Sequence, residues 1–204
     1  MCGIFGCYGF KNINDEEILD SINHRGPDFQ GLYKVSNLSL YHTRLSILDL
    51  SSGANQPMHS GDKRFTIVFN GEIYNHNEIR NELTKYDFKT TSDTETVIAA
   101  YEMWGEYCLQ KFNGIFAVAI FDHSLNRLFI ARDHFGVKPL YIFYSETTQQ
   151  LAFGSEIKSF LKVPFKKELD AKSIMNYNSC MWSPGERTGF KSIKKIGVSR
   201  LVSK

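Results

Sequence analysis

The order of its predicted strands and helices restricts this 204-residue chain to a layered α+β fold. Short segments rich in β-branched and aromatic residues, bounded by turn residues, predict the strands. These segments are residues 2–9, 29–34, 38–43 and 65–69, followed later by 115–121, 128–132, 140–144 and 150–153. Helices separate the two groups of strands instead of alternating with single strands. That order favours stacked layers over a parallel sheet.

The helices between and after the strands are predicted from capping residues and apolar periodicity. The strongest pattern is Ser92-Asp93-Thr94-Glu95, which matches a capping box and precedes a helix with one apolar face. Further helices are expected at 15–22, 75–86, 155–161 and 171–177, the first capped by Asp15 and the third by Ser155.

Composition excludes a disordered or membrane-spanning chain. Hydrophobic residues make up 42% and charged residues 23% of the sequence, a balance typical of globular proteins. No apolar run has the length of a membrane span, and no basic-then-apolar leader opens the chain, so we expect a cytoplasmic protein. The four cysteines include no CxxC pair and are expected to be reduced thiols. The six histidines lack the spacing of metal ligands, so no metal site is expected.

Charge is distributed unevenly along the chain. Residues 1–157 carry 13 Lys and Arg against 19 Asp and Glu, whereas residues 158–204 carry 11 against 3. The tail lysines are dispersed and no nucleic-acid-binding motif accompanies them, so we expect no nucleic-acid partner. A solvated face, or a basic surface that meets another domain, explains the tail better. We therefore expect residues beyond about 162 to pack poorly in isolation.

Cys2 is the first candidate for chemistry. Removal of Met1 would place its thiol and a free α-amine on one carbon. The amine has a reference pKa of roughly 7.7–8.0, so it can serve as the base for the thiol. Nucleophiles activated in this way perform acyl transfer. The alternative is an ordinary buried cysteine.

Asn70-Gly71 has two interpretations. Asn-Gly is a strong signal for a two-residue hairpin turn. However, the residues that follow predict the start of a helix and not a second strand. The alternative is an oxyanion hole built from the Asn70 side-chain amide and the Gly71 N–H. Loss of one such donor costs on the order of 10²–10³ in rate.

Arg44 and Asp93 form a possible clamp for an amino-acid zwitterion. Arg44 follows the strand 38–43, where it can be a solvated strand-end charge or can hold a carboxylate in a bidentate pair. Asp93 can simply favour the first turn of its helix. Its other possible role is to pair with a substrate ammonium group.

With these residues in place, the chain resembles the N-terminal glutaminase domain of asparagine synthetase. That domain is a class II glutamine amidotransferase of the N-terminal nucleophile hydrolase type. The matching segments occur in the family's order and cover roughly residues 2–196. They are Cys2-Gly3-Ile4, Arg25-Gly26-Pro27-Asp28, His42-Thr43-Arg44-Leu45-Ser46-Ile47, Asn70-Gly71-Glu72-Ile73-Tyr74-Asn75, Ser92-Asp93-Thr94-Glu95, Ala131-Arg132-Asp133 with Gly136 to Tyr141, and Phe153-Gly154-Ser155-Glu156-Ile157-Lys158.

The resemblance implies an αββα sandwich of two antiparallel sheets and a role for each matching residue. Cys2 would attack the side-chain amide of L-glutamine, with Asn70 and Gly71 as the oxyanion hole. Arg44 would hold the α-carboxylate, Asp93 and the Glu72 region would hold the α-amine, and the backbone of Ile47 and Leu48 would line the pocket. Arg132, Asp133 and Lys138 are expected to form a salt-bridged turn with a structural role.

The resemblance also implies a partner. Asparagine synthetases continue into an ATP-dependent synthetase domain, whose pyrophosphate loop is absent from this sequence. We therefore expect a glutamine amidotransferase domain at 2–161 and a basic tail at 162–204 that resembles the linker into a synthetase domain. The chain is expected to be a truncated form or a free-standing subunit, with no cofactor of its own, and ATP and magnesium would serve only the synthetase. A silent glutamine-binding module, another amide substrate, or ammonia supply to a different amidation such as surface amino-sugar synthesis are the alternatives.

Overall fold

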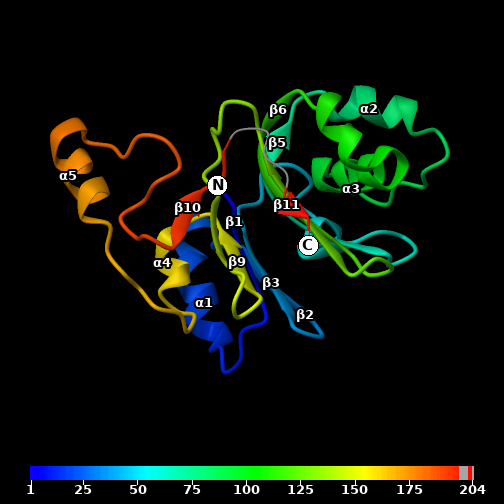
Figure 1. Cartoon of the computed structure of the whole chain (residues 1–204). Coiled ribbons are helices and arrows are strands. Elements are labelled where there is room, and N and C mark those ends of the chain that lie inside the picture. Colours follow the sequence, from blue (N-terminus) through cyan, green and yellow to red (C-terminus); the bar gives the residue numbers. More distant parts are fainter. Residues whose placement is uncertain (198–201, 204) are drawn as a thin grey trace.

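Two antiparallel sheets lie face to face, with helices on both outer faces, in the computed structural model of the chain (Figure 1). The structure describes residues 1–197 and the backbone of residues 202–203. The expected αββα sandwich is confirmed. None of the helices in this part of the chain has the length and apolar character needed to cross a membrane.

The sheets have six and five strands. The six-stranded sheet contains, in spatial order, β10 (Ile193–Lys195), β8 (Tyr141–Ser145), β9 (Gln150–Gly154), β1 (Gly3–Tyr8), β3 (Leu38–Arg44) and β2 (Phe29–Val35). The five-stranded sheet contains β11 (Val202–Ser203), β7 (Arg127–Arg132), β6 (Gly114–Asp122), β5 (Phe65–Ile73) and β4 (Met58–His59). The first strand of the chain therefore lies in the interior of its sheet.

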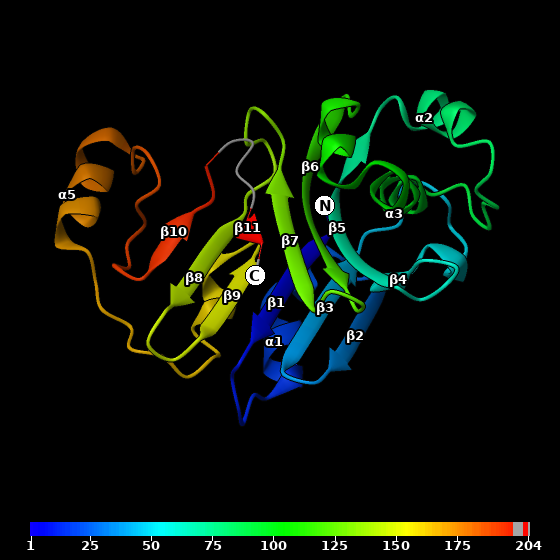
Figure 2. The same cartoon turned by 45° about the vertical axis from the view of Figure 1, so that its right-hand side comes forward.

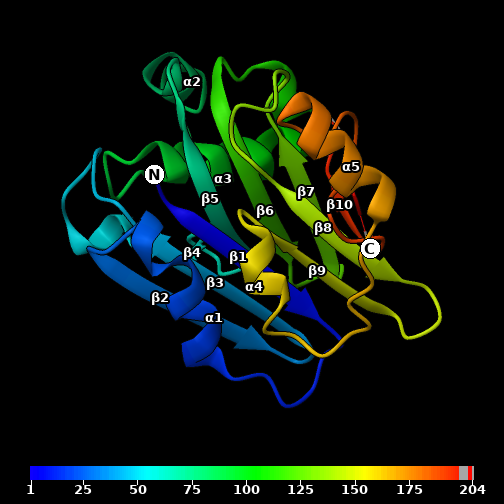
Figure 3. The same cartoon turned by 90° about the vertical axis from the view of Figure 1, so that its left-hand side faces the viewer.

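Helices cover each sheet on the side that faces away from the other (Figures 2 and 3). Over the six-stranded sheet lie α1 (Asp15–Ile22) and α4 (Ile157–Phe160), and over the five-stranded sheet lie α2 (His76–Glu82) and α3 (Asp93–Trp104). The remaining helices are α5 (Ala171–Cys180) and three short 3₁₀ turns, η1 (Asn23–Arg25), η2 (Ser52–Ala54) and η3 (Gly105–Gln110).

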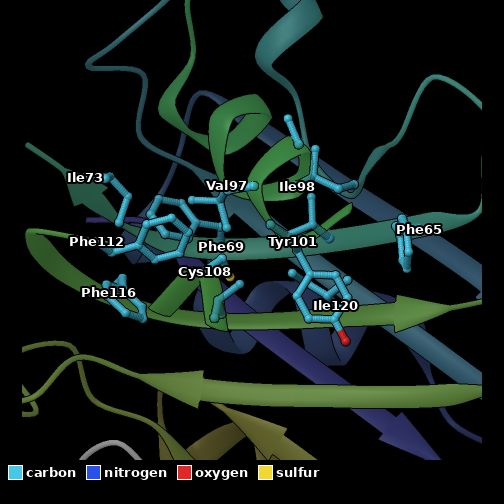
Figure 4. Close-up of a cluster of buried hydrophobic side chains, with 14 of the residues drawn as sticks. Phe65, Phe69, Ile73, Val97, Ile98, Tyr101, Cys108, Phe112, Phe116 and Ile120 are labelled. Atoms are coloured by element: carbon cyan, nitrogen blue, oxygen red, sulfur yellow. The ribbon is translucent and has the colours of Figure 1, made fainter. Parts of the chain in front are cut away.

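The alternation of side chains along β6 shows how one strand serves two layers. Ala117, Ala119 and Phe121 face the other sheet, where they pack in a cluster that includes Ile4 and Val68. The residues between them face α3 and join a second cluster (Figure 4). Since successive side chains of a strand point to opposite faces, both faces of this strand must be apolar. Its continuous apolar sequence meets that requirement.

Two predicted helix caps are wrong in detail. The N-cap of α1 is Asn14, whose side chain accepts the N–H of Glu17, and Asp15 is the first helical residue. Ser155 does not cap α4. Instead its hydroxyl accepts the N–H of Ile4 at 3.1 Å, which ties the end of β9 to the start of β1.

At α3 the cap is confirmed, because the Ser92 hydroxyl accepts the N–H of Thr94. The reciprocal half of the capping box is not formed. Glu95 accepts the N–H groups of Lys89 and Thr90 in the preceding loop. The helix predicted at 75–86 ends earlier, at Glu82, where the chain turns to bury Leu83.

The tail is better packed than expected. β10 pairs with β8, and Ile193 and Ile196 are buried. The expectation of poor packing is therefore wrong for residues 193–196. The sequence did not indicate this strand because three residues are too few to show a periodic pattern. By contrast, α5 has only Ser173 buried and stands away from the sheets (Figure 1). A domain boundary after residue 161 stays a prediction, and residues 198–201 and 204 of that tail lie outside the described residues.

Replacement of Ile193 by Ala tests the packing of β10. Ile193 lies in a buried cluster with Phe143 and Phe160, so we expect Ile193→Ala to lower the free energy of unfolding by about 2–5 kcal/mol. Ile174 on α5 is 39% exposed, and Ile174→Ala should cost no more than about 0.5 kcal/mol. Urea unfolding of both variants gives the comparison. Equal, small losses would show that β10 is not packed against the sheet.

Candidate active site

One pocket gathers all eight residues that the sequence analysis singled out. Its lining includes Cys2, Arg44, Ile47, Leu48, Asn70, Gly71, Glu72 and Asp93. They come from the start of β1, the end of β3, the loop that follows it, the second half of β5 and the first turn of α3. The structure thus brings together residues that are up to 91 positions apart in the sequence.

Strand alternation explains why three of them face the same space. In β1, β3 and β5 the residues that pack between the sheets include Ile4, Leu40 and Val68. Alternate residues share a face, so Cys2, Arg44 and Asn70 belong to that same inner face. The pocket is the polar continuation of the layer between the sheets.

Cys2 is held in place by a hydrogen bond to its backbone carbonyl. Arg25 Nε donates to the Cys2 carbonyl at 2.9 Å, and the guanidinium is braced by Glu156 at 3.0 Å. The thiol faces the Leu45 carbonyl at 3.8 Å. Burial raises the pKa of the Cys2 thiol, an effect that the nearby Arg44 charge offsets in part. A thiol in this environment needs a base.

The amino group nearest the thiol is that of Met1, which stands in for the amine that Cys2 would carry after removal of Met1. Burial lowers the pKa of this Met1 amine, and the charges of Arg25 and Lys138 lower it further. Both effects favour the neutral form, which is the form that accepts a proton. The Cys2 charge opposes this fall in pKa in part. A neutral amine beside the thiol is the form that can take its proton.

Asn70 and Gly71 lie inside β5, opposite Ala117 and Phe116 of β6. The hairpin interpretation of Asn-Gly is therefore wrong. Asn70 is 1% exposed, and its Nδ2 has no hydrogen-bond partner among the described residues. A buried donor without an acceptor costs about 1–3 kcal/mol. Gly71 is required by the sheet, since a Cβ there would lie 2.4 Å from the Ile115 carbonyl oxygen.

Arg44 organises the loop that follows β3. Its guanidinium donates to Ser51 O at 2.8 Å, to Asn55 Oδ1 at 2.7 Å and to Asp49 O. These acceptors are neutral, and Arg44 forms no ion pair with a carboxylate in the part of the chain that the structure describes. Its charge is 6% exposed and available to an anion in the pocket. Ile47 and Leu48 lie on this loop and line the pocket, and the role of their backbone stays a prediction.

Asp93 supplies the opposite charge. Its Oδ2 accepts the N–H of Ile73 at 3.0 Å, and the side chain is 5% exposed. Burial raises the pKa of Asp93 to about 6, and the nearby Glu72 carboxylate adds to the rise. No described cation pairs with it. A substrate ammonium group would remove this electrostatic cost.

Lys138 and Gln56 are pocket residues that sequence reasoning missed. Lys138 was assigned to a salt-bridged turn, and that assignment is wrong. Within residues 1–197 the Asp133 carboxylate accepts four backbone N–H groups, including that of Lys138, and no ion pair forms there. Gln56 lies in a loop without periodicity, where no sequence signal marks it.

The described residues contain no cluster of three His, Cys, Asp or Glu side chains that could hold a metal ion. The expectation that the chain has no cofactor of its own stays a prediction.

Comparison with known proteins places these features in a family. The family model for the glutamine amidotransferase domain matches residues 1–203. Asparagine synthetase [glutamine-hydrolyzing] 1 of Bacillus subtilis is 36% identical over 96% of this chain and 32% of its own length. Asparagine synthetase B of Escherichia coli is 40% identical over 80% of this chain and 30% of its own length. The chain thus spans about a third of the length of these curated relatives.

Among solved structures, glutamine phosphoribosylpyrophosphate amidotransferase of B. subtilis has the same fold. It superimposes with a TM-score of 0.67 at 18% identity and covers all of this chain and 49% of its own. At that identity the likeness concerns the fold alone.

Replacement of Asp93 by Asn should stabilise the protein near neutral pH. The pKa of about 6 in the folded protein lies above the ordinary aspartate value of 3.8. Folding therefore favours the protonated carboxyl, and this contribution is present at low pH and lost as the pH rises through 6. We expect Asp93→Asn to raise the free energy of unfolding by about 1–2 kcal/mol at about pH 7.5, with most of the gain gone at about pH 4.5.

Asp49→Asn is the matched control. Hydrogen bonds from Ser51 and Thr91 hold the pKa of Asp49 at about 2, so its loss should destabilise the protein at neutral pH. Urea unfolding at both pH values decides. A loss of stability in both variants at neutral pH would contradict the assignment of Asp93 as an unpaired buried charge.

Proposed function

Because the chain belongs to the glutamine amidotransferase domain family, we propose that it hydrolyses L-glutamine to L-glutamate and ammonia, with Cys2 as the nucleophile. The observation that carries this proposal is the Asn70 amide, a buried donor that finds no acceptor among the described residues and lies in the same pocket as the Cys2 thiol. Such a donor is expected where negative charge develops during the reaction.

Binding comes first. The α-carboxylate of glutamine pairs with Arg44, and its α-ammonium pairs with Asp93, beside Glu72. Both charges lack ionic partners in the described structure, so the substrate supplies what the pocket lacks. The backbone of Ile47 and Leu48 borders the substrate. Two fixed charges orient the side-chain amide towards Cys2, which lowers the entropic cost of the reaction.

The chemistry then follows in two halves. The α-amine of Cys2 takes the thiol proton, and the sulfur attacks the amide carbon. The resulting oxyanion accepts hydrogen bonds from Asn70 Nδ2 and the Gly71 N–H. The amine returns the proton to the leaving nitrogen, ammonia departs and a glutamyl thioester remains. Water, deprotonated by the same amine, attacks the thioester and releases glutamate and the thiol.

The ammonia is proposed to serve a synthetase domain or subunit that forms asparagine. The named relatives are glutamine-hydrolysing asparagine synthetases of about three times this length. ATP and magnesium would belong to that partner and not to this pocket. The alternative is that the ammonia serves a different acceptor. A panel of acceptors, each tested together with the synthetase that uses it, distinguishes asparagine formation from other amidations. We also propose a cytoplasmic location, since all four cysteines are free thiols, as suits a reducing compartment.

Removal of Met1 should switch the activity on. Protein with Cys2 as its first residue is expected to release glutamate from glutamine, whereas protein that retains Met1 has no free amine on Cys2. Intact-mass analysis identifies the two forms, and coupled glutamate detection measures their rates. Cys2→Ala in the processed form is the control. Equal rates in all three would refute the proposal, and glutamine binding without turnover in the processed wild type would support a silent binding module.

Replacement of Asn70 by Ala should lower kcat by about 10²–10³-fold while KM changes little, because the oxyanion exists only in the transition state. Asn75 is the matched control, since the bonds of its side chain among the described residues go to the backbone of Lys111 and Asn113. Asn75→Ala should leave kcat unchanged. A change in KM alone for Asn70→Ala would place this amide in substrate binding instead.

A further inference from the structure

Gln56 connects two parts of the pocket that have no direct link in sequence. Its side chain is buried, with 5% exposure. Oε1 accepts the N–H of Phe69 at 2.6 Å, and Nε2 donates to Thr94 Oγ1 at 3.1 Å. Phe69 immediately precedes Asn70, and Thr94 immediately follows Asp93. We propose that Gln56 is a positioning residue that holds the oxyanion donor and the ammonium-binding carboxylate in a fixed relation.

The sheet register explains why a side chain is needed at this place. β4 pairs with β5 through Met58 opposite Ile67 and His59 opposite Thr66. Continued by two residues, that register would put Gln56 opposite Phe69. The chain leaves the sheet before that point, so the Phe69 N–H would lack a backbone partner. The Gln56 amide oxygen takes that place and secures β5 one residue before the oxyanion donor.

The other end of the amide reaches the helix. Thr94 is 3% exposed, and its N–H is bound to the Ser92 cap. A bond from Gln56 to the Thr94 hydroxyl therefore fixes the first turn of α3, which carries Asp93. One side chain thus sets the distance between a strand of the sheet and the helix that covers it.

Gln56 itself is held on both sides. Its carbonyl packs against β2 of the other sheet, where a Cβ on Gly31 would lie 1.9 Å from the Gln56 oxygen. The preceding residue, Asn55, is bound by Arg44 at 2.7 Å. Arg44, the proposed clamp for the substrate carboxylate, therefore holds the residue next to Gln56 in the same loop. Through Gln56 and the adjacent Asn55, this loop links Arg44, Asn70 and Asp93.

The kinetic form of this inference rests on the proposed glutaminase activity. A small misplacement of a reacting group can cost about 10²-fold in rate. Gln56→Met keeps the side-chain length but removes both hydrogen bonds. We expect it to raise KM for glutamine and lower kcat, with kcat/KM reduced by about 10- to 100-fold. Thr94→Val removes only the helix bond and should act mainly on KM.

Thr66→Val is the control for a merely structural effect. Thr66 lies on β5, the strand that carries Phe69 and Asn70, and is fully buried. Its hydroxyl bonds to His59 and His123 at 2.9 and 2.7 Å. Its loss should lower the melting temperature to a degree similar to Gln56→Met while KM and kcat stay within about twofold of wild type. If Gln56→Met also leaves KM and kcat within that range, the positioning role is overturned.

A second readout separates this inference from the proposed function. Amide hydrogen exchange at Phe69 and Thr94, followed by NMR, does not depend on turnover. Gln56→Met should speed exchange at both amides relative to Thr66→Val. Wild type could show no glutaminase activity while Gln56→Met still speeds exchange at both amides. The proposed function would then fail, but the positioning role of Gln56 would stand. Unchanged exchange at both amides in Gln56→Met overturns the positioning role of Gln56, whatever the activity.

Discussion

The active-site pocket depends on the contact between the two sheets. Ile4 of β1 and Val68 of β5 meet in the apolar layer between them. Ile4 lies two residues after Cys2, and Val68 lies two residues before Asn70. Because strand side chains alternate, the apolar contact decides which face Cys2 and Asn70 share, the proposed nucleophile and the proposed oxyanion donor. Shifting either strand by one residue would send one of these groups to the opposite face.

The same pocket carries electrostatic costs that the fold tolerates. Within the described part of the chain, the buried Asn70 donor has no acceptor and the hydrogen-bond acceptors of Arg44 are all neutral. Burial also raises the pKa of Asp93 to about 6. Such features lower stability in exchange for function. In the proposed complex a zwitterion with an amide side chain would relieve all three costs, which gives a physical reason for the proposed choice of glutamine. The neighbouring loop and the Gln56 amide keep these groups in place while they lack a ligand.

Sequence reasoning predicted the layers and the site members better than the local details. Long apolar strands and the Ser92 cap carry strong local signals, so most of the elements were placed within a few residues. Asn70-Gly71 was ambiguous because turn propensity is local, whereas the close approach of β6 that requires Gly71 is not. The role of Gln56 could not be predicted, since it depends on where β4 ends relative to β5. β10 was missed because three residues show no period.

Cys2 is proposed to form a covalent intermediate with glutamine. Rapid acid quenching of the processed protein during turnover, followed by peptide mass analysis, tests it directly. We expect one glutamyl group on the N-terminal peptide, absent in Cys2→Ala and lost on treatment with hydroxylamine, which cleaves thioesters. Steady glutamate release without any glutamyl adduct on that peptide, in Asn70→Ala as well as in wild type, would contradict it.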